Sequence, residues 1–146
     1  YFFVLYQRYI CSDDNYAYYV NLLFGSQNAL VRWLIRHPFK NLLRNYLWNQ
    51  VYAQGVARHS PERIVELARA DLDAVGALLP PSGYLFSEDR LTVYDACVYG
   101  FLCNAIYGPD LKEDLGVKQY IHDEHPHMID YVNRIRDEFF AHGSPQ

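Results

Sequence analysis

Thr92 and Asp95 place a hydroxyl and a carboxylate three positions apart, at the head of an uncharged apolar run. A carboxylate beside a hydroxyl can serve acid–base chemistry. The same spacing is that of a capping box, in which the Thr hydroxyl accepts from the Asp95 amide and the carboxylate accepts from the Thr92 amide. Because the apolar run follows directly, we interpret the pair as the start of a helix and expect no catalytic role.

The densest group of potential metal ligands comprises His122, Asp123, Glu124, His125 and His127. Imidazole and carboxylate together suit zinc or a similar ion. Pro126 interrupts any helical register within the group, so the ligands would not share one helix face. We therefore predict no metal site.

Arg58 and His59 stand at a turn just before Ser60-Pro61-Glu62, a helix start. A charged side chain beside a helix end can pair with carbonyls or with a bound carboxylate. Two interpretations remain open, pinning of the turn and ligand binding, and we favour pinning. No catalytic triad, paired-carboxylate signature, phosphate loop or dinucleotide glycine pattern is recognisable.

Composition narrows the function classes. The chain has 146 residues, 51% hydrophobic and 21% charged, with 14 Tyr and 8 Phe, which predicts a single folded domain over residues 1–146. A net charge of -4 argues against nucleic-acid binding. The uncharged stretch Ala96 to Pro109 is shorter than the ~20 residues of a membrane span. Cys11, Cys97 and Cys103 form no C-x-x-C pair, which favours the reducing cytoplasm and buried, structural cysteines.

Helical periodicity and helix-ending residues predict an all-α fold. In the first half we expect helices over Phe2 to Ile10, from about Ser12 to Gly25, and from Asn28 to Gln54 with a bend at His37-Pro38. In the second half we expect helices from Ser60 to Leu79, after Asp95, and within Leu111 to Tyr120. A last amphipathic helix carries Ile129, Val132, Ile135 and Phe139. The run from Ala96 to Ile106 is apolar on nearly every side, so we expect it to be the buried central helix of a bundle.

Several of these segments together resemble a known family. They are Leu91-Thr92-x-x-Asp95-Ala96, an outer amphipathic helix before it, and His125-Pro126-x-Met128 before the last helix. Their order resembles the C-terminal domain of glutathione transferases, where such a Thr and Asp cap the central helix and where His125-Pro126 is a loop. Three further stretches, Gln54–Glu62, Ala70–Val75 and Tyr131–Ile135, resemble the failed-axon-connections and metaxin-like branch.

The resemblance carries functional expectations. In whole glutathione transferases a thioredoxin-like domain binds the glutathione cofactor, and no strand-rich segment of that kind occurs in this chain. The chain alone is therefore expected to bind no cofactor and to lack conjugating activity. By resemblance the first helix lines an apolar second-substrate pocket and faces the thioredoxin-like domain, which makes Tyr6, Arg8 and Tyr9 pocket candidates. The alternative for these three is packing in the core or in a homodimer contact.

Two functions follow as expectations. The first is the helical half of a glutathione-transferase-like protein, which packs on a thioredoxin-like domain of the same or another chain. It predicts that the reading frame extends upstream by about one small domain. The second is a non-enzymatic protein-interaction module of the failed-axon-connections and metaxin type, with the aromatic N-terminal helices as its partner surface.

Overall fold

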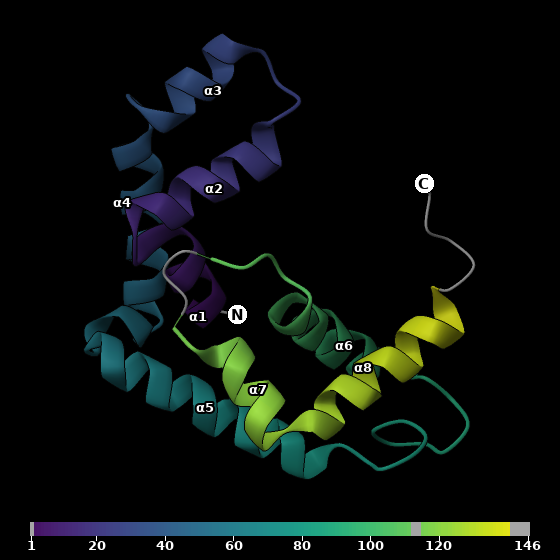
Figure 1. Ribbon diagram of the computed structural model, residues 1–146. Coiled ribbons are helices and arrows are strands. Elements are labelled where there is room, and N and C mark those ends of the chain that lie inside the picture. The colour runs from purple at the N-terminus through teal and green to yellow at the C-terminus, as the bar shows by residue number, and fades with distance from the viewer. Residues whose placement is uncertain (1, 112–114, 141–146) are drawn as a thin grey trace. The chain divides into compact units, whose positions relative to one another are not determined.

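The computed structural model describes residues 2–111 and 115–140, and their secondary structure is helical apart from one isolated bridge between Tyr84 and Ser87. The all-α class is thereby confirmed. The elements are α1 (Phe2–Leu5), the π-helical turn η1 (Tyr6–Ile10), α2 (Asp13–Phe24), α3 (Ala29–Arg36), α4 (Lys40–Ala53), the 3-10 turn η2 (Val56–Arg58), α5 (Pro61–Leu78), α6 (Val93–Ile106), α7 (Val117–Glu124) and α8 (Pro126–Phe139) (Figure 1).

The chain divides into two compact units. The first comprises Tyr1–Glu66 and Asp110–Leu115, and the second comprises Leu67–Pro109 and Gly116–Gln146. Helix α5 supplies its first residues to the first unit and the remainder to the second. The single domain over 1–146 stays a prediction.

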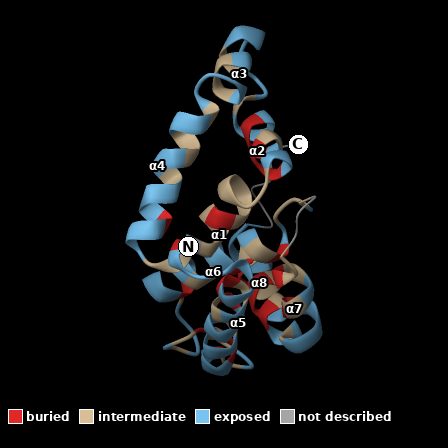
Figure 2. Cartoon of the chain, turned by 90° about the vertical axis from the view of Figure 1, so that its left-hand side faces the viewer, coloured by how far each residue is buried: buried red, intermediate tan, exposed pale blue. Residues whose placement is uncertain are grey.

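In the first unit, helices α2, α3 and α4 follow one another, with α3 at the end of the unit away from α1 (Figure 1). Ser12 begins α2 by accepting a hydrogen bond from the Asn15 amide at 3.0 Å, as the sequence predicts. One core cluster of the unit comprises Tyr6, Val51, Ala57 and Ile64, and Tyr16, Tyr19 and Val20 of α2 are also buried. Its outer surfaces are largely exposed, as the pale blue of α3 and α4 shows (Figure 2).

The predicted bend at His37-Pro38 is a complete break between two helices. α3 ends at Arg36 and α4 begins at Lys40, because proline cannot donate the next helical hydrogen bond. After the break, helical spacing predicts one inward face made of Leu42, Leu43, Tyr46, Leu47 and Val51. Val51 is buried and Leu43 and Leu47 are half-buried, whereas Leu42 and Tyr46 are exposed.

The second unit is built around α8, which contacts both α6 and α7 (Figure 1). Met128, Tyr131, Val132 and Ile135 of α8 are fully covered. The prediction for this helix is right for Val132 and Ile135 and wrong for Phe139, which is exposed. α7 lies at Val117–Glu124, later than predicted, and the earlier part of the expected range falls partly outside the described residues.

Helix α6 begins and ends as the sequence predicts, but its neighbours do not enclose it. Within the run from Ala96 to Ile106, Leu102 and Ile106 are buried on one side, whereas Cys97 is exposed and Phe101 is 43% exposed on the other. The expectation of complete burial is therefore corrected. Apolar residues on every side of a helix show that no side carries charged residues. They do not determine which sides the rest of this chain buries.

None of the helices in the described ranges is both long enough and apolar enough to cross a bilayer.

Candidate functional site

Asp95 is the centre of the most highly connected polar group in the second unit. Its side chain is 0% exposed. Oδ2 accepts from the Thr92 amide at 2.9 Å and from the Thr92 hydroxyl at 2.5 Å, and the Asp95 amide in turn donates to the Thr92 hydroxyl at 3.5 Å. The two hydrogen bonds made by the backbone amides of Thr92 and Asp95 form a capping box.

The other oxygen of the carboxylate ties two more segments to the start of α6. Oδ1 accepts from the Leu85 amide at 2.7 Å and from the Tyr131 hydroxyl of α8 at 2.7 Å. Two donors on each oxygen use the roughly four acceptor positions of a carboxylate. Asp95 therefore links the loop before α6, the first turn of α6 and α8.

The charge state of Asp95 follows from these donors. Burial raises the pKa of a carboxyl, but the donors from Leu85, Thr92 and Tyr131 outweigh it and lower the pKa of Asp95 to about 2. Burial and the same carboxylate raise the pKa of Tyr131. At neutral pH an ionised Asp95 thus accepts from a protonated Tyr131, and neither group is poised to exchange a proton.

The loop between α5 and α6 is held from the side of α8. The Arg134 guanidinium donates to the Gly83 carbonyl at 3.0 Å and to the Pro81 carbonyl at 3.3 Å. The Tyr84 hydroxyl donates to Glu138 at 2.6 Å, and this hydrogen bond is the first cause that raises the pKa of Tyr84 to about 12. The network as a whole positions a loop and a helix end, and its chemistry is structural.

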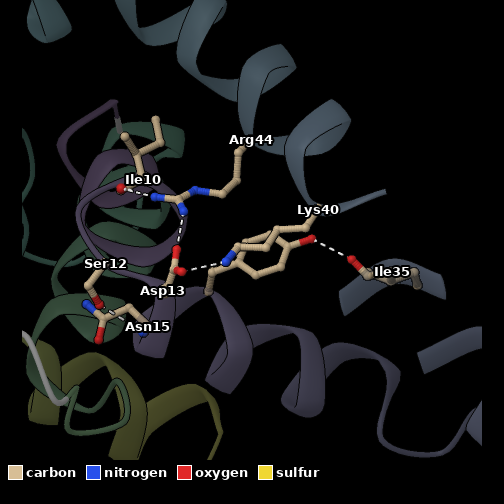
Figure 3. A network of polar contacts seen from close by, with 8 residues as sticks. Ile10, Ser12, Asp13, Asn15, Ile35, Lys40 and Arg44 are labelled. Carbon is tan, nitrogen blue, oxygen red and sulfur yellow. Dashed lines mark hydrogen bonds and ion pairs between the residues drawn. The ribbon is translucent and has the colours of Figure 1, made fainter. Parts of the chain in front are cut away.

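A second polar group lies in the first unit, at the start of α2. Figure 3 shows the Lys40 and Arg44 side chains of α4 reaching Asp13, with Lys40 Nζ 2.6 Å from Oδ2. Arg44 also donates to the Ile10 carbonyl. Lys40, followed by Arg44, lowers the pKa of Asp13. Because Asp13 is largely exposed, we interpret this group as a tether between α2 and α4.

The three pocket candidates of the first helix lie on two sides of the turn η1. Tyr6 is buried in the core of the first unit, and burial raises its pKa. The Arg8 guanidinium lies 4.8 Å from the centre of the Tyr19 ring. The centres of the Tyr9 and Tyr19 rings are 5.5 Å apart. The geometry thus favours core packing for Tyr6, and it groups Arg8 and Tyr9 around Tyr19.

Arg58 lies against the end of α4. Its Nε donates to the Tyr52 carbonyl at 3.0 Å, and its guanidinium lies 5.1 Å from the centre of the Tyr52 ring. His59 ends the 3-10 turn, where its amide donates to the Val56 carbonyl. Gly55, at φ 99°, supplies the left-handed residue that ends α4. These contacts favour the pinning of the turn.

The histidines near α8 also contact backbone and carboxylate groups within the second unit. His125 Nε2 is 2.8 Å from Asp73, which also accepts from the Tyr120 hydroxyl at 2.6 Å. His127 Nε2 is 3.1 Å from the Gly76 carbonyl. Among the described residues no three His, Cys, Asp or Glu side chains lie close enough to share a metal ion.

The cysteines differ in environment. Cys97 is exposed on α6, so the expectation that all three are buried is wrong for this residue. Cys11 and Cys103 are half-buried, and the Cys11 thiol donates to the Gln7 carbonyl at 2.9 Å.

Sequence reasoning found Thr92 and Asp95 but missed their partners. Tyr84 and Glu138 gave no local signal, because only the packing of α8 against the loop before α6 brings them together. Tyr131 and Arg134 were marked only as part of the stretch of family resemblance Tyr131–Ile135.

Comparison with known proteins shows a family resemblance over the second half of the chain. Residues 68–135 match the model of the family described as glutathione S-transferase, C-terminal domain. An isoprene-epoxide glutathione S-transferase of Rhodococcus sp. (strain AD45) is 31% identical over 86 residues, which are 59% of this chain and 34% of that protein. Failed axon connections of Drosophila melanogaster is 27% identical over 90 residues, which are 60% of this chain and 21% of that protein.

The chain thus spans about a third of the first relative and about a fifth of the second. The search of solved structures gave no match. The matched segment holds the capping box, α6, α7 and most of α8, the part of the chain with the clearest resemblance in sequence. Residues 68–135, slightly less than half of the chain, are therefore similar to the glutathione S-transferase C-terminal-domain family.

Proposed function

We propose that this chain is the helical half of a glutathione-transferase-like protein, which packs on a thioredoxin-like domain and supplies the wall of an apolar second-substrate pocket. In this proposal the thioredoxin-like domain binds glutathione and the helical domain conjugates nothing alone. We place the protein in the cytoplasm, where glutathione is available.

The observation that carries the proposal is the uncovered apolar face of α6. Val93, Tyr94 and Phe101 are exposed there, and Phe86 of the preceding loop packs edge-to-face on Tyr94 at 5.3 Å. A contiguous exposed apolar surface marks a contact with another protein surface. The similarity of residues 68–135 to that family makes a thioredoxin-like domain the natural occupant.

The chemistry of the network around Asp95 supports a structural and not a catalytic role for the helical domain. Asp95 has each oxygen occupied by two donors and a pKa of about 2, so it cannot act as a general acid near neutral pH. Its role is to hold α6 and the preceding loop in a fixed position for the partner domain.

The test is to compare the 146-residue chain with the product of its whole reading frame. We expect the reading frame to encode a thioredoxin-like domain upstream, and the longer product to conjugate glutathione to 1-chloro-2,4-dinitrobenzene while the chain alone does not. A start codon close before Tyr1, with no thioredoxin-like partner in trans, would overturn the proposal.

A second candidate function is a non-enzymatic protein-interaction module, which the similarity to failed axon connections favours. Its partner surface would be the exposed stripe of Leu42, Tyr46 and Tyr52 on α4. This candidate predicts a longer product that binds no glutathione and turns over no electrophile. A glutathione-agarose column separates the two candidates, because only the transferase-like protein is retained.

A further inference from the structure

The turn between α2 and α3 carries large apolar side chains on its outside. Leu22 and Leu23 in the last turn of α2 are each more than half exposed, and in α3 Leu30 is 63% and Trp33 54% exposed. None of the residues of α3 is buried. We call Leu22, Leu23, Leu30 and Trp33 the hairpin tip.

Hydrogen bonds connect the segments that carry the hairpin tip. The Asn28 side chain caps α3 by accepting from the Val31 amide at 2.9 Å, and Arg32 donates to the Gly25 carbonyl across the turn. The Tyr16 hydroxyl of α2 donates to the Ile35 carbonyl of α3 at 3.0 Å, so the two helices are tied at the other end as well (Figure 3). The apolar tip is therefore presented by a defined hairpin.

Along the sequence, the residues of the hairpin that follow Asp14 carry charge of one sign. No Asp or Glu stands between Asp14 and Glu62, whereas the same stretch carries Arg32, Arg36, Lys40, Arg44 and Arg58. All but two of the 17 acidic residues of the chain follow from Glu62 onward. Lys40 and Arg44 of α4 form ion pairs with Asp13. The cationic residues of α3 are Arg32 and Arg36.

Trp33, Leu30 and Arg36 lie on one stripe of α3, because residues three apart on a helix are neighbours. Leu and Trp beside Arg is the pattern of a helix that lies at a bilayer surface, with its apolar side chains at the headgroup boundary and its cations toward anionic lipid. A protruding apolar turn fits a deformable bilayer, whereas a folded protein partner would need a matching groove.

We propose that the hairpin tip is a membrane-surface docking site, which inserts Leu22, Leu23, Leu30 and Trp33 into the headgroup region of an anionic bilayer. Arg32 and Arg36 contribute the electrostatic attraction. The site is independent of the proposed function, because it lies on α2 and α3 and uses neither the face of α6 nor glutathione. Binding is reversible and salt-dependent, since the inserted segment is short and the charges are at the surface.

The experiment measures binding of the 146-residue chain to vesicles of phosphatidylcholine with and without 30% phosphatidylserine. Trp48→Phe leaves Trp33 as the only tryptophan, since the chain has 2. We expect co-sedimentation with the anionic vesicles, and a blue shift of Trp33 emission with protection from acrylamide on their addition. Raising the salt concentration to about 0.5 M should release the protein.

Paired variants assign the effect to the hairpin tip. Leu30→Ser should weaken binding roughly tenfold, because it removes a leucine that inserts into the headgroup region of the bilayer. Leu78→Ser is its control, since Leu78 is 71% exposed on α5. Arg36→Glu should weaken binding by more than about fivefold, with Arg90→Glu as the control of equal charge change on an exposed loop. Circular dichroism shows that each variant is folded.

Three results would overturn the docking site. One is no binding, or equal binding to neutral and anionic vesicles. Another is equal loss from Leu30→Ser and Leu78→Ser. A third is that the tip variants abolish self-association or binding to an acidic protein while the vesicles bind nothing, in which case the tip is a protein interface.

Discussion

The hydroxyl of Tyr131 in α8 donates to the carboxylate of Asp95 at the start of α6 at 2.7 Å, in the interior of the second unit. This one contact joins the last helix to the capping box of the helix that the family resemblance places at the centre. It is one of four hydrogen bonds that the Asp95 carboxylate accepts.

Asp95→Ala removes the acceptor of four hydrogen bonds and leaves the amides of Leu85 and Thr92 and the hydroxyl of Tyr131 without it. We expect a loss of about 3 kcal/mol in the free energy of unfolding, from the lost cap and the buried donors left unpaired. Urea unfolding followed by circular dichroism measures it. Asp71→Ala, at an exposed position of α5, should change stability by less than about 0.5 kcal/mol. Equal effects of the two variants would contradict the role of Asp95.

Tyr131→Phe tests the link between α8 and α6 without creating a cavity. It removes one donor to Asp95 and should cost about 1.5 kcal/mol. Tyr94→Phe is the matched control on an exposed ring. In a double-mutant cycle with Asp95→Ala, the two losses should fall short of adding, because each variant breaks the same hydrogen bond. Strict additivity would show that the two residues act independently.

Acid stability should report the ionised state of Asp95. Its pKa is about 2 in the folded chain and near 3.8 when it is not perturbed, so the stabilisation is fully present above about pH 4 and is lost as the pH falls toward 2. Wild-type protein should therefore lose stability in this range more steeply than Asp95→Asn, which has no carboxyl to protonate. Thermal unfolding at several pH values between 2 and 5 makes the comparison, and parallel profiles would refute the assignment.

Two glycines should respond to alanine in opposite directions. Gly83 has φ +72°, and a Cβ there would lie 2.8 Å from the Glu88 backbone, so Gly83→Ala should cost about 1–2 kcal/mol and disturb the loop before α6. Gly100 lies within α6 with open space at its Cβ position, so Gly100→Ala should add roughly 0.5–1 kcal/mol. The difference in melting temperature between the two variants tests both assignments at once.

The sequence predicted local features better than the faces of the helices. Ser12, Gly55 and the pair Thr92 and Asp95 act through neighbours a few residues away, so their spacing sufficed. The exposure of Leu42, Tyr46 and Phe139 depends on which helices lie opposite, and apolar residues all round a helix leave that undetermined. Arg134 and Glu138 of α8 contact Gly83 and Tyr84 in the loop before α6 across about 50 residues of sequence, which no short motif records.

The accessibility of Cys97 on the exposed side of α6 tests the central claim most directly. The thiol lies on the helix whose uncovered face we assign to the thioredoxin-like domain, and with Cys11→Ser and Cys103→Ser it is the only cysteine left in the chain. We expect Cys97 to react rapidly with a maleimide in the 146-residue chain, and at least about tenfold more slowly in the product of the whole reading frame. Equal rates in the two proteins would contradict the account.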